Sequence, residues 1–187
     1  YYRELFKYGQ VAGTNKKDTF SVKTALDKVE VEHIRNKKSG DVSMGVYTYD
    51  PKITKELWIY GLDDDDQMQV IGEKSSMTIK LIGGRNNDIY DIDTKTPVTV
   101  FDYNSKNNTL KQTDNAKIVL RDQYQLNQYD YRKTPINILS ILPNVAYNKD
   151  NGVMLGIKGS LTVNKFNQNP FTQQHQFGLN FDFATSG

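Results

Sequence analysis

The feature that most constrains the fold is a pair of apolar segments that each end in glycine and lead into a polar turn. Gly61 is followed by an acidic run at 63–66, and Gly83 is followed by an amide-rich run at 86–88. The spacing is constant, because 22 residues separate Gly61 from Gly83 and the same number separate the ends of the two polar runs. A repeat of this length is typical of architectures built from stacked repeats.

Strand-like segments recur on either side of these turns at a similar spacing. We expect first strands at 57–60, 79–82, 98–101 and 118–120, and second strands at 68–71, 89–92 and 110–113. A small β-solenoid fits this spacing, since coils of about 20 residues would each bury an apolar side on the next coil. An antiparallel sandwich, whose strands recur every roughly 8 to 12 residues, fits it as well.

The N-terminal part gives weaker patterns. Residues 1–8 predict one or two helical turns, which Gly9 ends. A β-hairpin is expected where two alternating segments, 29–34 and 42–49, flank the turn-forming sequence 37–41. After residue 122 the periodicity stops, which indicates a linker.

The C-terminal segment alternates between large apolar and small or polar residues. Its apolar face would carry Phe177, Leu179, Phe181 and Phe183, and its other face Gly178, Asn180 and Asp182. This pattern is typical of a transmembrane barrel strand, although an amphipathic strand of a soluble sandwich has the same period. Two or three strands cannot close a barrel and lipid does not tolerate an open sheet edge, so the barrel interpretation requires strands beyond this chain.

Composition narrows the classes of function. The 24 basic and 22 acidic residues interleave to a net charge of +2, so a basic face for nucleic acid is not expected and we predict no nucleic-acid partner. There is no cysteine, which excludes a disulfide framework and a thiolate metal site. The mean hydropathy of −0.66 is polar, and no apolar run is long enough for a membrane-spanning helix.

Calcium is the one cofactor that the sequence suggests. The sequence GGRNNDIYD at 83–91 approximates the calcium-binding nonapeptide of parallel β-rolls, with Asn86 where glycine is usual. Stacked turns would bring together the hard oxygen ligands that calcium prefers. The candidate ligands are Asp63, Asp64, Asp66, Asn86, Asn87 and Asp88. The alternative is that these residues only form turns, as Gly, Asn and Asp commonly do.

No catalytic residue is predicted, and we expect that this chain is not an enzyme. His33 and His175 are the only histidines, and neither has a second ligand at metal-binding spacing. His33 is therefore interpreted as a surface or core residue of a strand. The nucleophile-elbow, Walker and dinucleotide-binding glycine motifs do not occur.

Segment 53–92 resembles a stretch in large outer-membrane proteins of Bacteroidota. The pattern T-K-E-[apolar]-x-[apolar]-Y-G-L-x-x-x-D is matched by Thr54, Lys55, Glu56, Tyr60, Gly61, Leu62 and Asp66, and the following G-G-x-x-x-D turn by Gly83, Gly84 and Asp88. Segment 143–187 is similar to the start of their BamA-type surface-antigen barrels, with Asp150, Gly152 and Gly156 in a D-x-G-[apolar]-x-[apolar]-G element. Such proteins often carry a calcineurin-like metallophosphoesterase, whose Asp, His and Asn metal-ligand signature is absent here.

The resemblance implies an all-β chain in the bacterial outer membrane. We expect a leader with a short helix and loop (1–26), a β-repeat domain (27–122), a linker (123–142) and the start of a transmembrane β-barrel (143–187). The β-domain would be a periplasmic or surface-exposed interaction module in outer-membrane protein biogenesis or export. Its partners would be outer-membrane lipid and other outer-membrane or periplasmic proteins. The alternatives are a soluble calcium-stabilised spacer or adhesion module, and an accessory domain of a membrane-anchored metallophosphoesterase.

Overall fold

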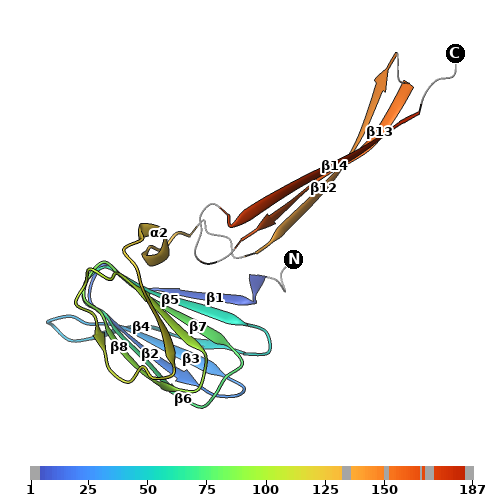
Figure 1. The fold of residues 1–187 in the computed structure, drawn as a ribbon. Coiled ribbons are helices and arrows are strands. Elements are labelled where there is room, and N and C mark those ends of the chain that lie inside the picture. Colours follow the sequence, from blue (N-terminus) through green and yellow to red (C-terminus); the bar gives the residue numbers. More distant parts are fainter. Residues whose placement is uncertain (1–4, 132–135, 150–151, 165, 167–170, 184–187) are drawn as a thin grey trace. The chain divides into compact units, whose positions relative to one another are not determined.

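The computed structural model describes residues 5–131, 136–149, 152–164, 166 and 171–183. The chain divides into two compact units, residues 1–131 and residues 132–187. The all-β class is confirmed, since three sheets account for the strands of the described residues and the helix α2 (Tyr124–Asn127) has only four residues (Figure 1). No helix in this part of the chain is both long and apolar enough to cross a membrane.

The first unit contains two sheets that face each other. The first sheet is parallel throughout and has the order β1 (Tyr8–Ala12), β5 (Glu56–Leu62), β7 (Thr78–Gly84), β9 (Val98–Asp102) and β11 (Ala116–Leu120). The second sheet has the order β10 (Thr109–Leu110), β8 (Ile89–Thr94), β6 (Gln67–Gly72), β2 (Asp18–Thr24), β3 (Val29–Arg35) and β4 (Val42–Tyr49). It is parallel from β10 to β2 and antiparallel from β2 to β4.

The strand pairing follows the repeat in the sequence. Leu57 pairs with Ile79 in the first sheet, and Gln67 pairs with Ile89 in the second, so both registers reproduce the 22-residue spacing. The antiparallel alternative is wrong for these repeats. Each turn carries the chain from one sheet to the other, and the next repeat therefore lies beside the previous one in the same direction.

The repeats also start earlier than the sequence pattern predicts. The region 1–26 is expected to be a leader, but β1 and β2 occupy 8–12 and 18–24 and form the first repeat. The predicted helical turns at 1–8 lie partly outside the described residues, and Tyr8 already belongs to β1. The predicted hairpin at 29–49 is confirmed as β3 and β4, which extend the second sheet sideways.

The core of the first unit is built from apolar side chains that stack from repeat to repeat. Ile59, Leu81 and Val100 occupy equivalent positions in β5, β7 and β9, and all three are fully buried. Phe20, Met68 and Tyr90 form the matching row in the second sheet. Because side chains alternate between the faces of a strand, each repeat places one apolar row against the opposite sheet.

The second unit is a three-stranded antiparallel sheet. Its strands β12 (Ile138–Asn148), β13 (Gly152–Val163) and β14 (Gln173–Phe183) pair in chain order. The sequence pattern places the start of this region at residue 143, but β12 begins at Ile138 and runs through Pro143. The segment predicted as a linker, 123–142, thus contains α2 and the first part of β12.

Candidate functional site

The residues proposed as calcium ligands lie in the turns that lead from the first sheet to the second. Three of these turns have the same spacing, a glycine followed five residues later by aspartate: Gly13 and Asp18, Gly61 and Asp66, Gly83 and Asp88. The fourth turn ends at Asn108 in the equivalent position, directly before β10. Parallel stacking places these four side chains one above another.

A column of hydrogen bonds joins the four turns. The backbone N–H of Asp18 donates to Asp66 Oδ1 at 2.7 Å, that of Asp66 donates to Asp88 Oδ1 at 2.8 Å, and that of Asp88 donates to Asn108 Oδ1 at 2.9 Å. The three aspartates are at most 1% exposed. Buried backbone donors without an acceptor are costly, so the side chains of Asp66, Asp88 and Asn108 each supply the acceptor that the preceding turn needs.

A second column lies further out, in the exposed part of the same turns. Asn87 N donates to Asp65 Oδ1 at 3.1 Å, and Asn107 N donates to Asn87 Oδ1 at 2.9 Å. Asn86, with its amide oxygen turned towards Asp64, accepts the Asp64 N–H at 3.0 Å. These side chains therefore connect neighbouring turns as well.

The structure brings together only part of the predicted calcium set. Asp66 and Asp88 are neighbours in the buried column, whereas Asp63, Asp64 and Asn86 are half-buried and Asn87 is exposed. Within the described ranges, no group of three or more acidic or histidine side chains is arranged to hold a metal ion. Calcium binding by this set stays a prediction.

The buried column has unusual electrostatics. Burial raises the pKa of Asp66 to about 9; the hydrogen bond from the Asp18 N–H opposes this, and the nearby Asp88 carboxyl adds to it. Burial also raises the pKa of Asp88, and the Asp102 carboxyl raises it further. The pKa of Asp102 is raised by burial as well, although the Tyr90 hydroxyl donates to its Oδ2 at 2.6 Å. At neutral pH, Asp66 is therefore largely protonated and uncharged, and the raised pKa of Asp88 favours its protonated form as well.

Glycine is required beside these carboxyl groups. A Cβ at Gly61 would clash with the Asp66 carboxyl and with the Gly83 carbonyl of the next repeat. A Cβ at Gly83 would clash with Asp88 and Asp102 in the same way. The glycine and the aspartate of each turn thus form one structural unit.

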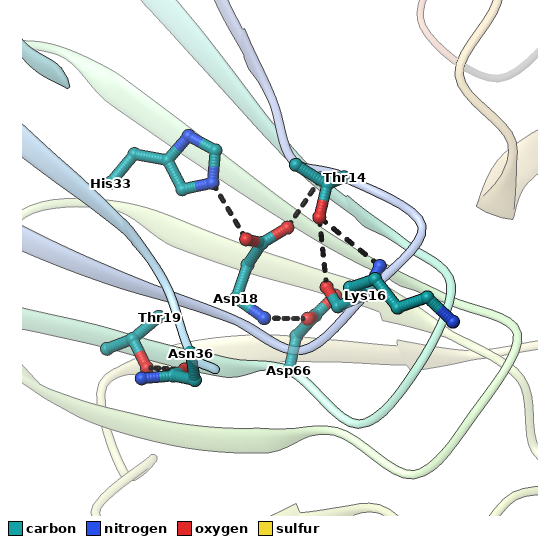
Figure 2. Close-up of polar contacts among 7 residues, drawn as sticks. All are labelled: Thr14, Lys16, Asp18, Thr19, His33, Asn36 and Asp66. Carbon is teal, nitrogen blue, oxygen red and sulfur yellow. Dashed lines mark hydrogen bonds and ion pairs between the residues drawn. The ribbon is translucent and has the colours of Figure 1, made fainter. Parts of the chain in front are cut away.

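The first turn contains a polar contact that the sequence patterns do not predict. His33 is 2% exposed and stacks on Phe20 with ring centroids 4.6 Å apart. Its Nε2 lies 3.1 Å from Asp18 Oδ1, an ion pair when the imidazole is protonated (Figure 2). The prediction that His33 is a surface or core residue is consistent with its position in the core.

A signal for Asp18 is present in the sequence, because Gly13 and Asp18 repeat the spacing of the later turns. The β3–β4 hairpin is inserted between the first repeat and the second, so the equivalent residues Asp18 and Asp66 lie 48 positions apart. This insertion conceals the repeat at the N-terminus. Asp102 and Tyr90 give no comparable signal, since their contact depends on how β8 faces β9.

Comparisons with family models, with curated proteins and with solved structures gave no match for this chain. Function is therefore inferred from the side chains and their geometry. The buried column closes turns: each of its links is a side-chain oxygen that accepts a backbone N–H. Because these side chains have a structural role, we look for a functional site on the exposed surfaces of the two units.

Proposed function

We propose that the chain is a non-catalytic part of an outer-membrane barrel protein, in which β12, β13 and β14 cross the membrane. Residues 8–131 would form a periplasmic or surface-exposed module for interaction or assembly. The main observation that supports this proposal is the exposed apolar face of the second unit. The resemblance of segments 53–92 and 143–187 to outer-membrane proteins of Bacteroidota supports the same function.

The apolar face is continuous across all three strands. Residues that pair directly in an antiparallel sheet point to the same side, and Val145, Leu155 and Phe181 form one such row. The exposed large apolar side chains of this face are Leu139, Ile141, Val145, Tyr147, Val153, Leu155, Ile157, Phe177, Leu179, Phe181 and Phe183. These side chains are between 42% and 75% exposed. Pro143, Gly159, Leu161 and His175 lie on the same face. Soluble monomers rarely expose a contiguous apolar surface of this extent.

The opposite face is mostly small and polar, as expected of the inside of a barrel, and its exposed large apolar side chains are Ile138 and Leu142 of β12. Asn144, Gly156 and Asn180 form one row across the sheet, and Lys158 and Gly178 pair beside it. A Cβ at Gly156 would clash with the side chains of Asn144 and Asn180, so this row is closely packed. Transmembrane barrel strands alternate apolar side chains towards lipid with polar side chains towards the interior.

Strand length fits as well. The three strands have 11, 12 and 11 residues, and a tilted strand needs roughly 9 to 11 residues to cross the hydrocarbon layer. In lipid, both edges of this sheet must pair with further strands, because unpaired backbone groups are not tolerated there. The membrane form therefore includes strands in addition to β12, β13 and β14.

For the first unit we infer a short β-solenoid, supported by the parallel register that repeats along both sheets. An interaction role is supported by β4, which forms one edge of the second sheet. Its side chains Val42, Met44, Val46 and Tyr47 are all more than a third exposed. Exposed edge strands accept an additional strand from a partner protein.

The membrane proposal is tested with single cysteines, since the chain has none of its own. Leu155→Cys, Ile157→Cys and Leu179→Cys on the apolar face are compared with Lys158→Cys and Asn180→Cys on the other face. Each variant is carried by the product of the complete reading frame, labelled with a fluorophore and reconstituted in vesicles that contain brominated lipid.

Quenching by the brominated acyl chains is expected at the first three positions and not at the last two. A soluble protein partner on the apolar face would protect these positions from water without quenching them. Equal quenching on both faces, or no quenching at all, would contradict the proposal and favour a soluble spacer. Sequencing the reading frame beyond residue 187 gives an independent check, because the proposal requires additional alternating strands in this protein or in an assembled copy.

A further inference from the structure

A basic hollow lies beside the first turn of the first unit, and it is independent of the membrane proposal. It has a volume of about 710 Å³, within the roughly 300 to 1,000 Å³ that small-molecule sites occupy. Five basic side chains line it, with one carboxylate: Lys16, Lys17, Arg35, Lys37, Lys38 and Asp64. The cations come from the β1–β2 turn and from the end of β3 and the turn after it.

Carboxylates of the described residues do not neutralise the excess positive charge. Among the described residues, none of the five basic side chains forms an ion pair with a carboxylate. The one carboxylate in the hollow, Asp64, accepts the backbone N–H of Asp65 at 3.0 Å. Five cations held together with Asp64 as the one carboxylate among them repel one another, and an anionic ligand relieves this repulsion.

A second hollow in the same unit has no such excess of positive charge, so the excess is not a general feature of hollows in this unit. It has a volume of about 390 Å³ and is lined by Lys74 and Lys95 together with Glu73 and Asp93. Its two cations are balanced by two carboxylates. The balanced hollow therefore provides a matched control for experiments on the basic one.

Neutral and planar donors accompany the lysines. Thr19 Oγ1 donates to Asn36 Oδ1 at 2.7 Å (Figure 2), which fixes the orientation of the Asn36 amide beside the hollow. Arg35 Nε is buried and lacks an acceptor among the described residues. In Figure 2 the Lys16 side chain extends away from the buried Asp18 and Asp66 carboxyl groups.

We propose that this basic hollow binds a ligand that carries at least two phosphoryl groups. Lysines act as point charges towards phosphate oxygens, and the Arg35 guanidinium offers a planar fork that matches two of them. A single phosphate would leave most of the five cations unpaired, whereas a diphosphate or several neighbouring lipid phosphates would engage them together. The ligand is either a soluble diphosphate or the phosphate headgroups of a lipid surface.

The experiment uses the full chain in a neutral detergent and compares it with two double variants. Lys17→Glu with Lys37→Glu reverses two charges in the basic hollow, and Lys74→Glu with Lys95→Glu reverses two in the balanced hollow. Binding of inorganic pyrophosphate is measured by calorimetry. Binding to vesicles of phosphatidylcholine, with and without phosphatidic acid, is measured by co-sedimentation. Circular dichroism checks that each variant keeps its sheet content. A third variant, Arg35→Gln, is measured in the same two assays and tests the guanidinium while all lysines stay in place.

Loss of pyrophosphate binding by about tenfold or more in the Lys17/Lys37 variant, but not in the control variant, supports a soluble diphosphate. The same loss seen only with phosphatidic acid vesicles supports a lipid headgroup. The proposal is overturned if the wild-type chain does not bind pyrophosphate and binds vesicles that contain phosphatidic acid no better than vesicles of phosphatidylcholine alone. It is also overturned if both double variants lose binding equally, because the effect would then reflect overall charge.

Discussion

The protonated state of Asp66 leads to a prediction that can be worked out in magnitude. Asp66 is fully buried, its pKa is raised to about 9, and the carboxyl groups of Asp88 and Asp18 face it. In the unfolded chain an aspartate has a pKa of about 3.9. Between these two values the folded state holds a proton that the unfolded state releases. The stability that Asp66 contributes is therefore fully present below about pH 4 and is lost as the pH rises towards 9.

One pH unit in this window corresponds to about 1.4 kcal/mol, so Asp66 lowers the free energy of unfolding by up to about 4 kcal/mol between pH 4 and pH 7. Asp66→Asn removes the ionisable group and keeps an oxygen that can accept the Asp18 N–H. Its amide places N–H donors in a buried site, which costs roughly 1 to 3 kcal/mol when they lack acceptors. We therefore expect the variant to equal or exceed the wild type at pH 7 and above, and to lose this advantage near pH 4.

The measurement is urea unfolding between pH 4 and pH 9, followed by the fluorescence of Trp58. This is the only tryptophan of the chain and it is buried in the first unit, so it reports that unit alone. Asp65→Asn is the matched control, because Asp65 is exposed and accepts the Asn87 N–H from the equivalent turn. The pH profile of Asp65→Asn should lie closer to that of the wild type than the profile of Asp66→Asn does.

The decisive quantity is the difference in slope between Asp66→Asn and the wild type, since the cost of the unpaired amide donors does not vary with pH. Parallel pH profiles for these two proteins would refute the assignment of a protonated carboxyl at Asp66. A variant that loses stability most at high pH would show that the ionised carboxylate is stabilised, for example by a bound cation.

Three further predictions concern the same turns. Gly61→Ala should destabilise the first unit by roughly 3 kcal/mol or more, because its Cβ overpacks a buried site. An unchanged free energy of unfolding, followed by Trp58 fluorescence, would contradict the close packing. His33→Gln should lower the free energy of unfolding reported by Trp58 by roughly 1 to 3 kcal/mol because it removes a buried aromatic contact and the pair with Asp18, and an unchanged value would refute that role. If calcium binds at the predicted ligands, added calcium should raise the urea midpoint of unfolding in the wild type but not in Asp63→Asn. A wild-type midpoint that does not change with calcium would exclude the calcium prediction.

The repeat itself could be predicted from the sequence because it depends on local chemistry. Short apolar segments at 57–60 and 79–82, each followed by glycine and polar turn residues, predict strands and turns from local sequence alone. The constant spacing then sets the register, and Leu57 does pair with Ile79. Alternation likewise predicts the two faces of β14, because successive side chains of a strand point to opposite sides.

The first repeat is harder to recognise, for a physical reason. The β3–β4 hairpin interrupts the chain between β2 and β5, so neighbours in the sheet are far apart in the sequence. A parallel sheet tolerates such an insertion at a turn because pairing depends on position in space and not on chain order. The strands β1 and β2 can therefore be recognised in residues 1–26 only by comparison with the later repeats.

Sequence patterns alone predict the all-β class, the strands and polar turns between residues 57 and 101, and the two faces of the last strand, because these follow from apolar segments, side-chain alternation and turn chemistry. Tertiary structure alone decided that neighbouring repeats pair in parallel and that Asp18, Asp66 and Asp88 stack in one buried column. It also decided that Lys16, Lys17 and Arg35 meet around one hollow. The protonation of Asp66 and the excess charge of the hollow arise from burial and proximity, which exist only once distant turns are brought side by side.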